Sequence, residues 1–413
     1  MNTKLVRIQR DIEELAKFNA TPERGLTRFS FTKEDRGARE YIKSEMIKAG
    51  LAVYEDAAGT VVGRLEGMIS DAPVVMVGSH YDSVKNGGNF DGSAGVVTGL
   101  EIARVLKENN LKPKHPIEFI AMIEEEGGRF GGGLFASRAM VGLVSLEQMN
   151  SFKDQQGISL GEAMDSFGFR ADRIKDAIRK PEELKCFVEL HIEQGPILEA
   201  NKKDIGIVEY IVGIQEFEVI MEGRPDHAGT TPMEMRADAL DGASNVIGKI
   251  SGFAKEVGEG TVATVGKLQV IPGAANIIPG EVRFTVDIRS KYAKCIENVR
   301  KEINHELEEI THKKGIHHTI REMLYVKPVK LSTEITKHLS ASCRELGMTE
   351  ERIISGAGHD AMIMAQITEV GLVFVPSKDG RSHCPEEWTN YEDLQKGIEV
   401  VYDTIKGMAE VLE

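Results

Sequence analysis

Hydrophobic positions near the N-terminus recur with helical spacing. Ile8, Ile12 and Leu15 fall on one face, and a second run that includes Ile42 and Met46 ends at a glycine. Apolar residues three or four positions apart form the buried face of an amphipathic helix. This pattern predicts two helices that pack against the body of the protein.

Short continuous apolar runs, bounded by glycine or polar turns, follow along the chain. They predict buried strands at 73–77, 117–123, 186–192, 205–208 and 372–375. Helical patterns predict helices at 94–107, 334–346 and 392–412. Strands that alternate with helices are typical of a partly parallel sheet covered by helices on both faces. The sequence therefore predicts an α/β fold with a mixed sheet.

Residues 213–329 have an order of elements of their own. Strand, helix, strand, strand, helix and strand are expected at 216–221, 235–253, 261–270, 281–288, 292–312 and 318–325. This β-α-β-β-α-β order is the split βαβ unit of ferredoxin-like α+β domains. We therefore predict that residues 1–212 and 330–413 form one domain, into which 213–329 are inserted as a second domain.

Charge and composition narrow the possible function. The 413 residues include 51 Lys and Arg against 65 Asp and Glu, a formal charge of −14. An acidic chain without a basic stripe is unsuited to a phosphate backbone, so we expect no nucleic-acid partner. No apolar run approaches the roughly 18 residues of a membrane span, and the N-terminus lacks an apolar signal core. We therefore expect a cytoplasmic protein without a membrane partner.

The positions of the four cysteines predict neither disulfides nor a structural metal site. Cys186, Cys295, Cys343 and Cys384 are far apart and form no Cys-x-x-Cys pair. Neither a disulfide framework nor a thiolate zinc knuckle is predicted, because both need closely spaced or paired cysteines.

Histidines and carboxylates fall where the predicted strands end. His80 follows the strand at 73–77, Glu124–Glu126 follow 117–123, His191 ends 186–192, and His383 comes after 372–375. In open α/β sheets, ligands bind in the crevice beyond the carboxyl ends of the strands. We therefore expect these side chains to meet at one site.

Imidazole and carboxylate without thiolate suit zinc or a neighbouring first-row metal ion. The set contains more ligands than one tetrahedral ion needs, which predicts two ions bridged by a carboxylate. Asp91, in a glycine-rich turn, is the natural bridge because glycine permits tight backbone conformations. Asp82 could accept the imidazole N–H of His80 and fix its tautomer.

The glutamate triplet Glu124–Glu126 would be costly to bury unpaired and is easier to understand beside a dication. One glutamate is expected to bind metal. A second is expected to take a proton from water and later give it to a leaving amine. The spacing alone does not decide which glutamate has which role.

Candidate substrate-binding residues lie in the inserted segment. His227 stands in a polar turn, Asn276 between two apolar residues, and Arg289 at the end of a strand. Arginine is the usual partner of a carboxylate, and histidine with asparagine can polarise a carbonyl oxygen. Ordinary loop polarity explains the same residues. His359, on a glycine turn, could line the cleft or be structural, and that turn lacks the features of a phosphate or dinucleotide loop.

Several segments together resemble a known family. They are Gly78-Ser79-His80-Tyr81-Asp82, Asn86-Gly87-Gly88-Asn89-Phe90-Asp91-Gly92, Glu125-Glu126-Gly127-Gly128-Arg129, Glu189-Leu190-His191-Ile192-Glu193-Gln194-Gly195-Pro196, His227-Ala228-Gly229-Thr230-Thr231 and Ser382-His383-Cys384-Pro385. The chain is similar, over nearly its whole length, to the amidase branch of the di-zinc aminoacylase and carboxypeptidase superfamily. That branch contains N-carbamoyl-L-amino acid hydrolases, allantoate amidohydrolases and beta-ureidopropionases.

The resemblance implies a role for each residue of the metal site. His80, Asp91 and His191 would hold one ion, while Asp91, Glu126 and His383 would hold the other. Glu125 would be the catalytic acid and base. We count Asp82, through its expected contact with His80, as the second catalytic residue. The implied cofactors are two divalent ions per subunit, zinc first, with manganese, cobalt or nickel as alternatives.

The resemblance also implies a substrate site and a partner. Gln194, His227, Asn276 and Arg289 would contact the substrate, and the inserted domain would act as a lid and dimerisation surface. The protein would be a homodimer in which His227 could reach the partner's site.

Histidine at position 191, where peptidases of the superfamily more often have an acid, favours the amidase branch. We therefore expect a di-metal amidohydrolase that cleaves the ureido C–N bond of N-carbamoyl-L-amino acids, with allantoate as the alternative substrate. A beta-ureidopropionase or an aminoacylase or peptidase is less favoured. Two further rivals are a cysteine amidase that uses Cys384 beside His383, and a silent ligand-binding protein, which the intact Glu125 argues against.

Overall fold

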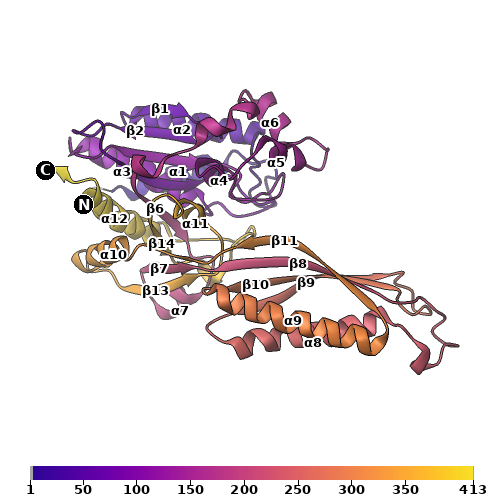
Figure 1. Ribbon diagram of the computed structural model, residues 1–413. Coiled ribbons are helices and arrows are strands. Elements are labelled where there is room, and N and C mark those ends of the chain that lie inside the picture. The colour runs from indigo at the N-terminus through magenta and orange to yellow at the C-terminus, as the bar shows by residue number, and fades with distance from the viewer. Residues whose placement is uncertain (1–2, 413) are drawn as a thin grey trace. The chain divides into compact units, whose positions relative to one another are not determined.

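The computed structural model describes residues 3–412, which form two compact units. The first unit comprises the chain up to 209, residues 331–353, and the chain from 358 onward. The second comprises residues 210–330 and 354–357. In Figure 1, where colour follows residue number, the second unit runs from magenta to orange.

The first unit combines a large sheet with helices. Its strands are β1 (Ala52–Glu55), β2 (Val61–Leu65), β3 (Val74–His80), β4 (Lys112–Pro113), β5 (Ile117–Met122), β6 (Leu184–Ile192), most of β7 (Ile205–Ile211), most of β13 (Glu350–Ser355), β14 (Glu369–Val375) and β15 (Val411–Leu412). Its α-helices are α1 (Leu5–Ala16), α2 (Lys33–Lys48), α3 (Ser93–Glu108), α4 (Phe135–Met140), α5 (Leu146–Ser151), α6 (Leu160–Phe167), α7 (Ile197–Asn201), α10 (Thr333–Glu345), α11 (Asp360–Met364) and α12 (Tyr391–Met408).

The centre of the sheet is parallel. The strand order is β1-β2-β5-β3-β6-β14-β7, and β13 pairs with β7. Neighbours β5, β3, β6 and β14 all run parallel, while β1, β2 and β7 pair antiparallel with their neighbours. The register sets His80 opposite Met122 and His191 opposite Phe374. The carboxyl ends of the four central strands therefore meet at one edge, where α/β sheets place their ligands.

Helices cover both faces of this sheet. Leu190 of β6 contacts α12, where a Cβ on Gly397 would lie 2.7 Å from the Leu190 Cδ1. The next residue, His191, packs instead against His359 at the start of α11, with ring centroids 4.6 Å apart. Successive residues of a strand point to opposite faces, so α12 and α11 lie on opposite sides of β6.

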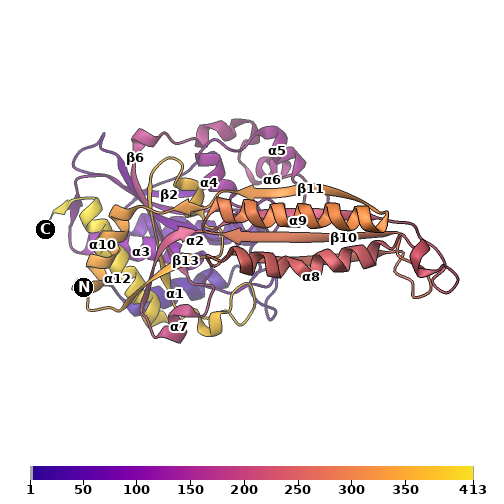
Figure 2. The same ribbon diagram turned by 60° about the horizontal axis from the view of Figure 1, so that its bottom comes forward.

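The second unit is a four-stranded antiparallel sheet with two helices. The strands are β8 (Gly213–Glu222), β9 (Val262–Ile271), β10 (Glu281–Ser290) and β11 (His317–Val326), in the order β11-β8-β10-β9. Helices α8 (Ala239–Val257) and α9 (Ala293–Lys314) run side by side along this sheet in Figures 1 and 2. Both helices contribute to one buried core with the strands, and this core includes Phe217 and Phe284. The short strand β12 (Val329–Lys330) pairs with the end of β7.

The α/β fold class is confirmed, and most of the predicted elements are present. The helix expected at 235–253 is wrong at both ends, since α8 is Ala239–Val257. It starts later than expected because Asp238 caps it by accepting hydrogen bonds from the backbone N–H groups of Leu240 and Asp241. Within residues 3–412, no helix is both long enough and apolar enough to cross a membrane.

Candidate active site

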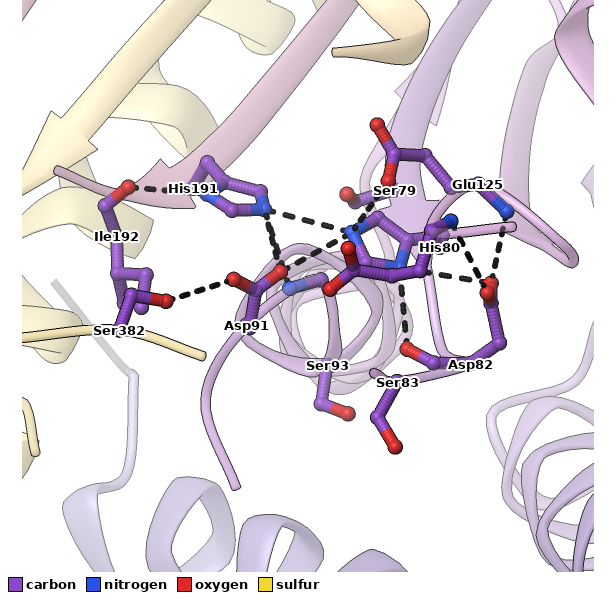
Figure 3. A network of polar contacts seen from close by, with 12 residues as sticks. Ser79, His80, Asp82, Ser83, Asp91, Ser93, Glu125, His191, Ile192 and Ser382 are labelled. Atoms are coloured by element: carbon purple, nitrogen blue, oxygen red, sulfur yellow. Dashed lines mark hydrogen bonds and ion pairs between the residues drawn. The ribbon is translucent and has the colours of Figure 1, made fainter. Parts of the chain in front are cut away.

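Three side chains from separate parts of the first unit converge on one point. His80 is the last residue of β3, His191 lies near the end of β6, and Asp91 precedes α3. The Asp91 Oδ1 lies 3.3 Å from the His80 Nε2 and 3.2 Å from the His191 Nε2, and the two nitrogens are 3.5 Å apart. Figure 3 shows Asp91 between the two imidazole rings.

The opposite ring nitrogens fix the orientation of both histidines. The His80 Nδ1 lies 3.2 Å from the backbone oxygen of Asp82, and the His191 Nδ1 lies 2.9 Å from the backbone oxygen of Ile192. A backbone oxygen only accepts, so each Nδ1 carries the proton and each Nε2 presents a lone pair. Two imidazole lone pairs and one carboxylate oxygen thus face each other, an arrangement that suits a cation.

A second group of possible metal ligands includes the same aspartate. The His383 Nε2 lies 3.5 Å from the Asp91 Oδ2 and 3.3 Å from the Glu126 Oε2. The Glu126 Oε1 is buried and has no hydrogen-bond partner among the described residues. Such an oxygen is costly to bury unless a ligand satisfies it.

Asp82 holds the loop that carries the glutamates. Its Oδ1 accepts a hydrogen bond from the Glu125 N–H at 3.1 Å, and its Oδ2 accepts one from the Glu126 N–H at 3.2 Å. The Asp82 Oδ1 also lies 3.5 Å from the His80 Nδ1, slightly farther than the Asp82 backbone oxygen. One buried carboxylate therefore connects the loop after β5 to the end of β3.

A glycine allows Asp91 to approach His80. Gly92 has φ +61, and a Cβ at this position would lie 2.4 Å from the His80 ring. Only glycine avoids both the backbone strain and this overlap. The glycine-rich turn of the sequence is thus explained by a close contact with an imidazole ring.

Glu125 lies beside these groups. Its Oε2 is 3.8 Å from the His80 Nε2, and its side chain is 10% exposed. Burial, with further repulsion from Glu126, raises the pKa of Glu125 well above its usual value. The hydrogen bonds of His383 to Asp91 and Glu126 raise the pKa of His383 to about 11.

The donor set fits divalent metal ions. Three groups have ligand atoms within 4.8 Å of one another: His80, Asp91 and His191; His80, Glu125 and Glu126; and Asp91, Glu126 and His383. All are imidazole nitrogens or carboxylate oxygens, the ligands of zinc and its neighbours.

Gln194 reaches the same centre. Its Nε2 donates a hydrogen bond to the Asp91 Oδ2 at 2.6 Å, and its buried Oε1 has no partner among residues 3–412. His359, for which the sequence left two interpretations open, is buried and packs on His191. Burial lowers the pKa of His359 well below its usual value.

The other three candidate substrate-binding residues lie in the second unit, at opposite ends of its sheet. His227 and Asn276 are in adjacent loops, joined by a hydrogen bond from the Ala228 N–H to the Asn276 backbone oxygen. These loops lie at the Glu281 end of β10, whereas Arg289 lies at the other end. At about 3.3 Å per residue, the two ends are roughly 26 Å apart.

Arg289 is held by its own unit. Its Nε and Nη2 donate hydrogen bonds to Asp287 at 3.0 Å, and its Nη1 donates to the backbone oxygen of Gly356 at 2.8 Å. The fork of the guanidinium is therefore already oriented by a carboxylate.

Sequence reasoning missed two residues of the site. The Ser382 Oγ lies 2.9 Å from the Asp91 Oδ2, and Glu387 accepts hydrogen bonds from the backbone that carries Asp91. Ser382 was visible only as a neighbour of His383. Nothing in the sequence distinguishes Glu387 from the adjacent Glu386.

Comparison with known proteins shows the family of the chain. Residues 76–407 match peptidase family M20/M25/M40. The chain belongs to this family. It is 45% identical to the N-carbamoyl-L-amino-acid amidohydrolase of Paenarthrobacter aurescens, in an alignment of 402 residues that covers 97% of each chain. It is 36% identical to the allantoate amidohydrolase of Bacillus subtilis, in an alignment of 398 residues that covers 96% of each chain.

Solved structures give the same result. An amidase of the hydantoinase/carbamoylase family from Burkholderia multivorans aligns with a TM-score of 0.90 at 36% identity and covers 98% of both chains. These relatives place the protein in the amidase branch of the M20/M25/M40 family, so the predicted family is confirmed. Enzymes of this family depend on metal, and the side-chain groups described above are candidates to bind it.

Proposed function

We propose that this M20/M25/M40 amidase hydrolyses the ureido C–N bond of N-carbamoyl-L-amino acids, releasing the amino acid, carbon dioxide and ammonia. The observation that carries the proposal is the convergence of His80, Asp91 and His191 on one point with Glu125 beside them. The 45% identical relative from Paenarthrobacter aurescens supports the choice of substrate.

In this proposal Asp91 would be a ligand of both of two divalent ions. His80 and His191 would hold one ion together with it, and Glu126 and His383 would hold the other. Zinc fits this set, and manganese, cobalt or nickel accept the same ligands. When bound, such ions polarise the ureido carbonyl and stabilise the negative charge that develops on its oxygen.

Glu125 moves the proton. Its raised pKa suits a carboxylate that first accepts a proton from the attacking water and then donates it to the departing nitrogen. Asp82 fixes the position of this carboxylate by binding the backbone N–H of Glu125. Both residues therefore act on the same step, Glu125 directly and Asp82 through the loop.

Four residues outside the metal ligands are proposed to contact the substrate. Gln194 lies at the metal site, where its unpartnered Oε1 can accept a hydrogen bond from the ureido group. Arg289 suits the substrate carboxylate. Because His227 and Asn276 lie at the other end of β10, we propose that they serve the site of a partner subunit in a homodimer. The roles of the second unit as lid and dimerisation surface rest on the family resemblance.

The decisive experiment replaces Glu125 with Gln, which keeps the shape and removes the base. Purified, metal-loaded protein is assayed with a panel of N-carbamoyl-L-amino acids and with allantoate, and bound metal is measured by mass spectrometry. We expect turnover of the carbamoyl amino acids to fall by about 10²- to 10⁴-fold while bound metal is unchanged. Retained turnover would contradict the role of Glu125.

Allantoate is the second candidate, because relatives named allantoate amidohydrolase from Bacillus subtilis and Escherichia coli are 36% and 34% identical. Allantoate is also a ureido acid, so the same centre could act on it. A higher kcat/KM with allantoate than with every carbamoyl amino acid would select this alternative. Inactivity on both substrates would refute the assignment to the amidase branch.

A further inference from the structure

A buried glutamate lies four residues after His383 and has no role in the chemistry proposed above. Glu387 is 4% exposed, whereas the side chain of the adjacent Glu386 is 59% exposed and forms an ion pair with Arg381. A carboxylate is rarely buried unless several donors satisfy it. The contacts of Glu387 show what it holds.

Both oxygens of Glu387 are used, and they bind different segments. The Oε1 accepts hydrogen bonds from the backbone N–H groups of Phe90 at 2.9 Å and Asp91 at 3.0 Å. The Oε2 lies 2.8 Å from the Ser382 Oγ, which is also 2.9 Å from the Asp91 Oδ2. One carboxylate thus joins the backbone of Asp91 to the residue before His383.

The surrounding residues are shaped for this contact. A Cβ on Gly88 would lie 2.3 Å from the Oε1 of Glu387, so the glycine leaves the space that the carboxylate occupies. On the other side, the Phe90 ring packs edge-on against Trp388, with centroids 5.2 Å apart. The turn before α3 and the segment after His383 are therefore in contact through both polar and aromatic groups.

We infer that Glu387 is a positioning residue that holds the Asp91 carboxylate at the correct place relative to His383. The inference rests on the metal site proposed above, in which Asp91 is shared and His383 binds one ion. Asp91 and His383 come from distant parts of the chain, and Glu387 contacts the backbone of one and the neighbour of the other. Partners that orient metal ligands in this way typically contribute 10- to 100-fold to metal affinity.

The role depends on reach rather than on charge. Glutamine is as long as glutamate, and its oxygen can still accept from Phe90 and Asp91, while its Nε2 can donate to Ser382. Aspartate keeps the charge but is one methylene shorter. Glu387→Gln and Glu387→Asp therefore separate the two explanations, and Glu386→Asp at the exposed neighbour is the matched control.

The test measures metal binding directly. Each full-length variant is stripped with a chelator, checked for folding by far-UV circular dichroism, and titrated with Zn²⁺ against a chromophoric competitor. The absorption spectrum of the Co²⁺ form reports the ligand geometry. We expect Glu387→Asp to bind Zn²⁺ about 10- to 100-fold more weakly, with an altered Co²⁺ spectrum. Glu387→Gln and Glu386→Asp should remain within about threefold of the native protein.

Each outcome decides between the explanations. If Glu387→Asp folds and binds both metals as the native protein does, Glu387 has no positioning role. If Glu387→Gln is the weaker binder, the charge matters and the inference is wrong. If the native protein itself binds no divalent metal, the proposed metal site fails, and that result is distinct from a change confined to the variants.

Discussion

Replacing Asp82 with Asn tests how the loop after β5 is held. The Asp82 side chain is 3% exposed, and each of its oxygens accepts one backbone N–H, from Glu125 and from Glu126. Asparagine has a single acceptor oxygen and must turn its NH₂ group toward one of these two donors. One hydrogen bond is therefore lost at nearly constant side-chain shape.

The structure sets the expected magnitude. A hydrogen bond to a charged acceptor contributes about 1.5–3 kcal/mol, and a buried donor left unpaired costs about 1–3 kcal/mol. The substitution also removes a negative charge whose repulsion raises the pKa of Glu124 and of Glu125, and this relief opposes the loss. We therefore expect the metal-free first unit to lose about 2 kcal/mol of its free energy of unfolding.

The single tryptophan of the chain, Trp388, makes this unit observable. Its ring packs against Phe90 and Tyr391, so its fluorescence reports unfolding of the first unit. Urea unfolding is followed by this fluorescence in the presence of a chelator. The dependence of the free energy of unfolding on urea concentration should be the same for both proteins, which checks that they unfold in the same way. Asp71→Asn is the control, because Asp71 is exposed and accepts a hydrogen bond from the hydroxyl of its neighbour Ser70 at 3.3 Å.

A shift of less than about 0.5 kcal/mol in Asp82→Asn, similar to that of an ordinary surface substitution, would refute this reasoning. It would mean that the Glu125 and Glu126 N–H groups find other acceptors, and that Asp82 does not hold the loop.

Four further predictions concern other parts of the chain. Gly92→Ala should lose most Zn²⁺ affinity in a competition titration, because its Cβ would overlap the His80 ring. Phe284→Ala should destabilise the second unit by about 3–5 kcal/mol in urea unfolding followed by circular dichroism, since the ring is fully buried. Cys384→Ser should keep its activity, and a loss would favour a cysteine amidase. Lys396 and Thr349 lower the pKa of Asp204 to about 2, so Asp204 stabilises the folded state above about pH 4, and this contribution disappears as the pH falls toward 2. Because the Lys396–Asp204 ion pair is partly exposed, Asp204→Asn should lower the free energy of unfolding by only about 1 kcal/mol at pH 7, measured by urea unfolding. If the variant and the native protein still differ by the same amount near pH 3, the pKa assigned to Asp204 is wrong.

The residue pattern predicted the central strands of the large sheet and the order of strands and helices along residues 213–329. Buried parallel strands are continuous apolar runs, so β3, β5, β6 and β14 were recognisable, whereas the short, partly exposed β1 was not. The start of α8 was misplaced because its boundary depends on the cap formed by Asp238, and the apolar residues before that cap imitate helical spacing.

By itself, the sequence determined which residue types lie at the carboxyl ends of the central strands, and hence that imidazoles and carboxylates would meet at one edge. It could not distinguish Glu387 from Glu386, because burial and reach depend on where Gly88 and Asp91 lie in space. Nor could it separate His227 and Asn276 from Arg289, since their positions follow from strand pairing. Local periodicity is encoded in neighbouring residues, whereas these distances are set by contacts between segments far apart in the chain.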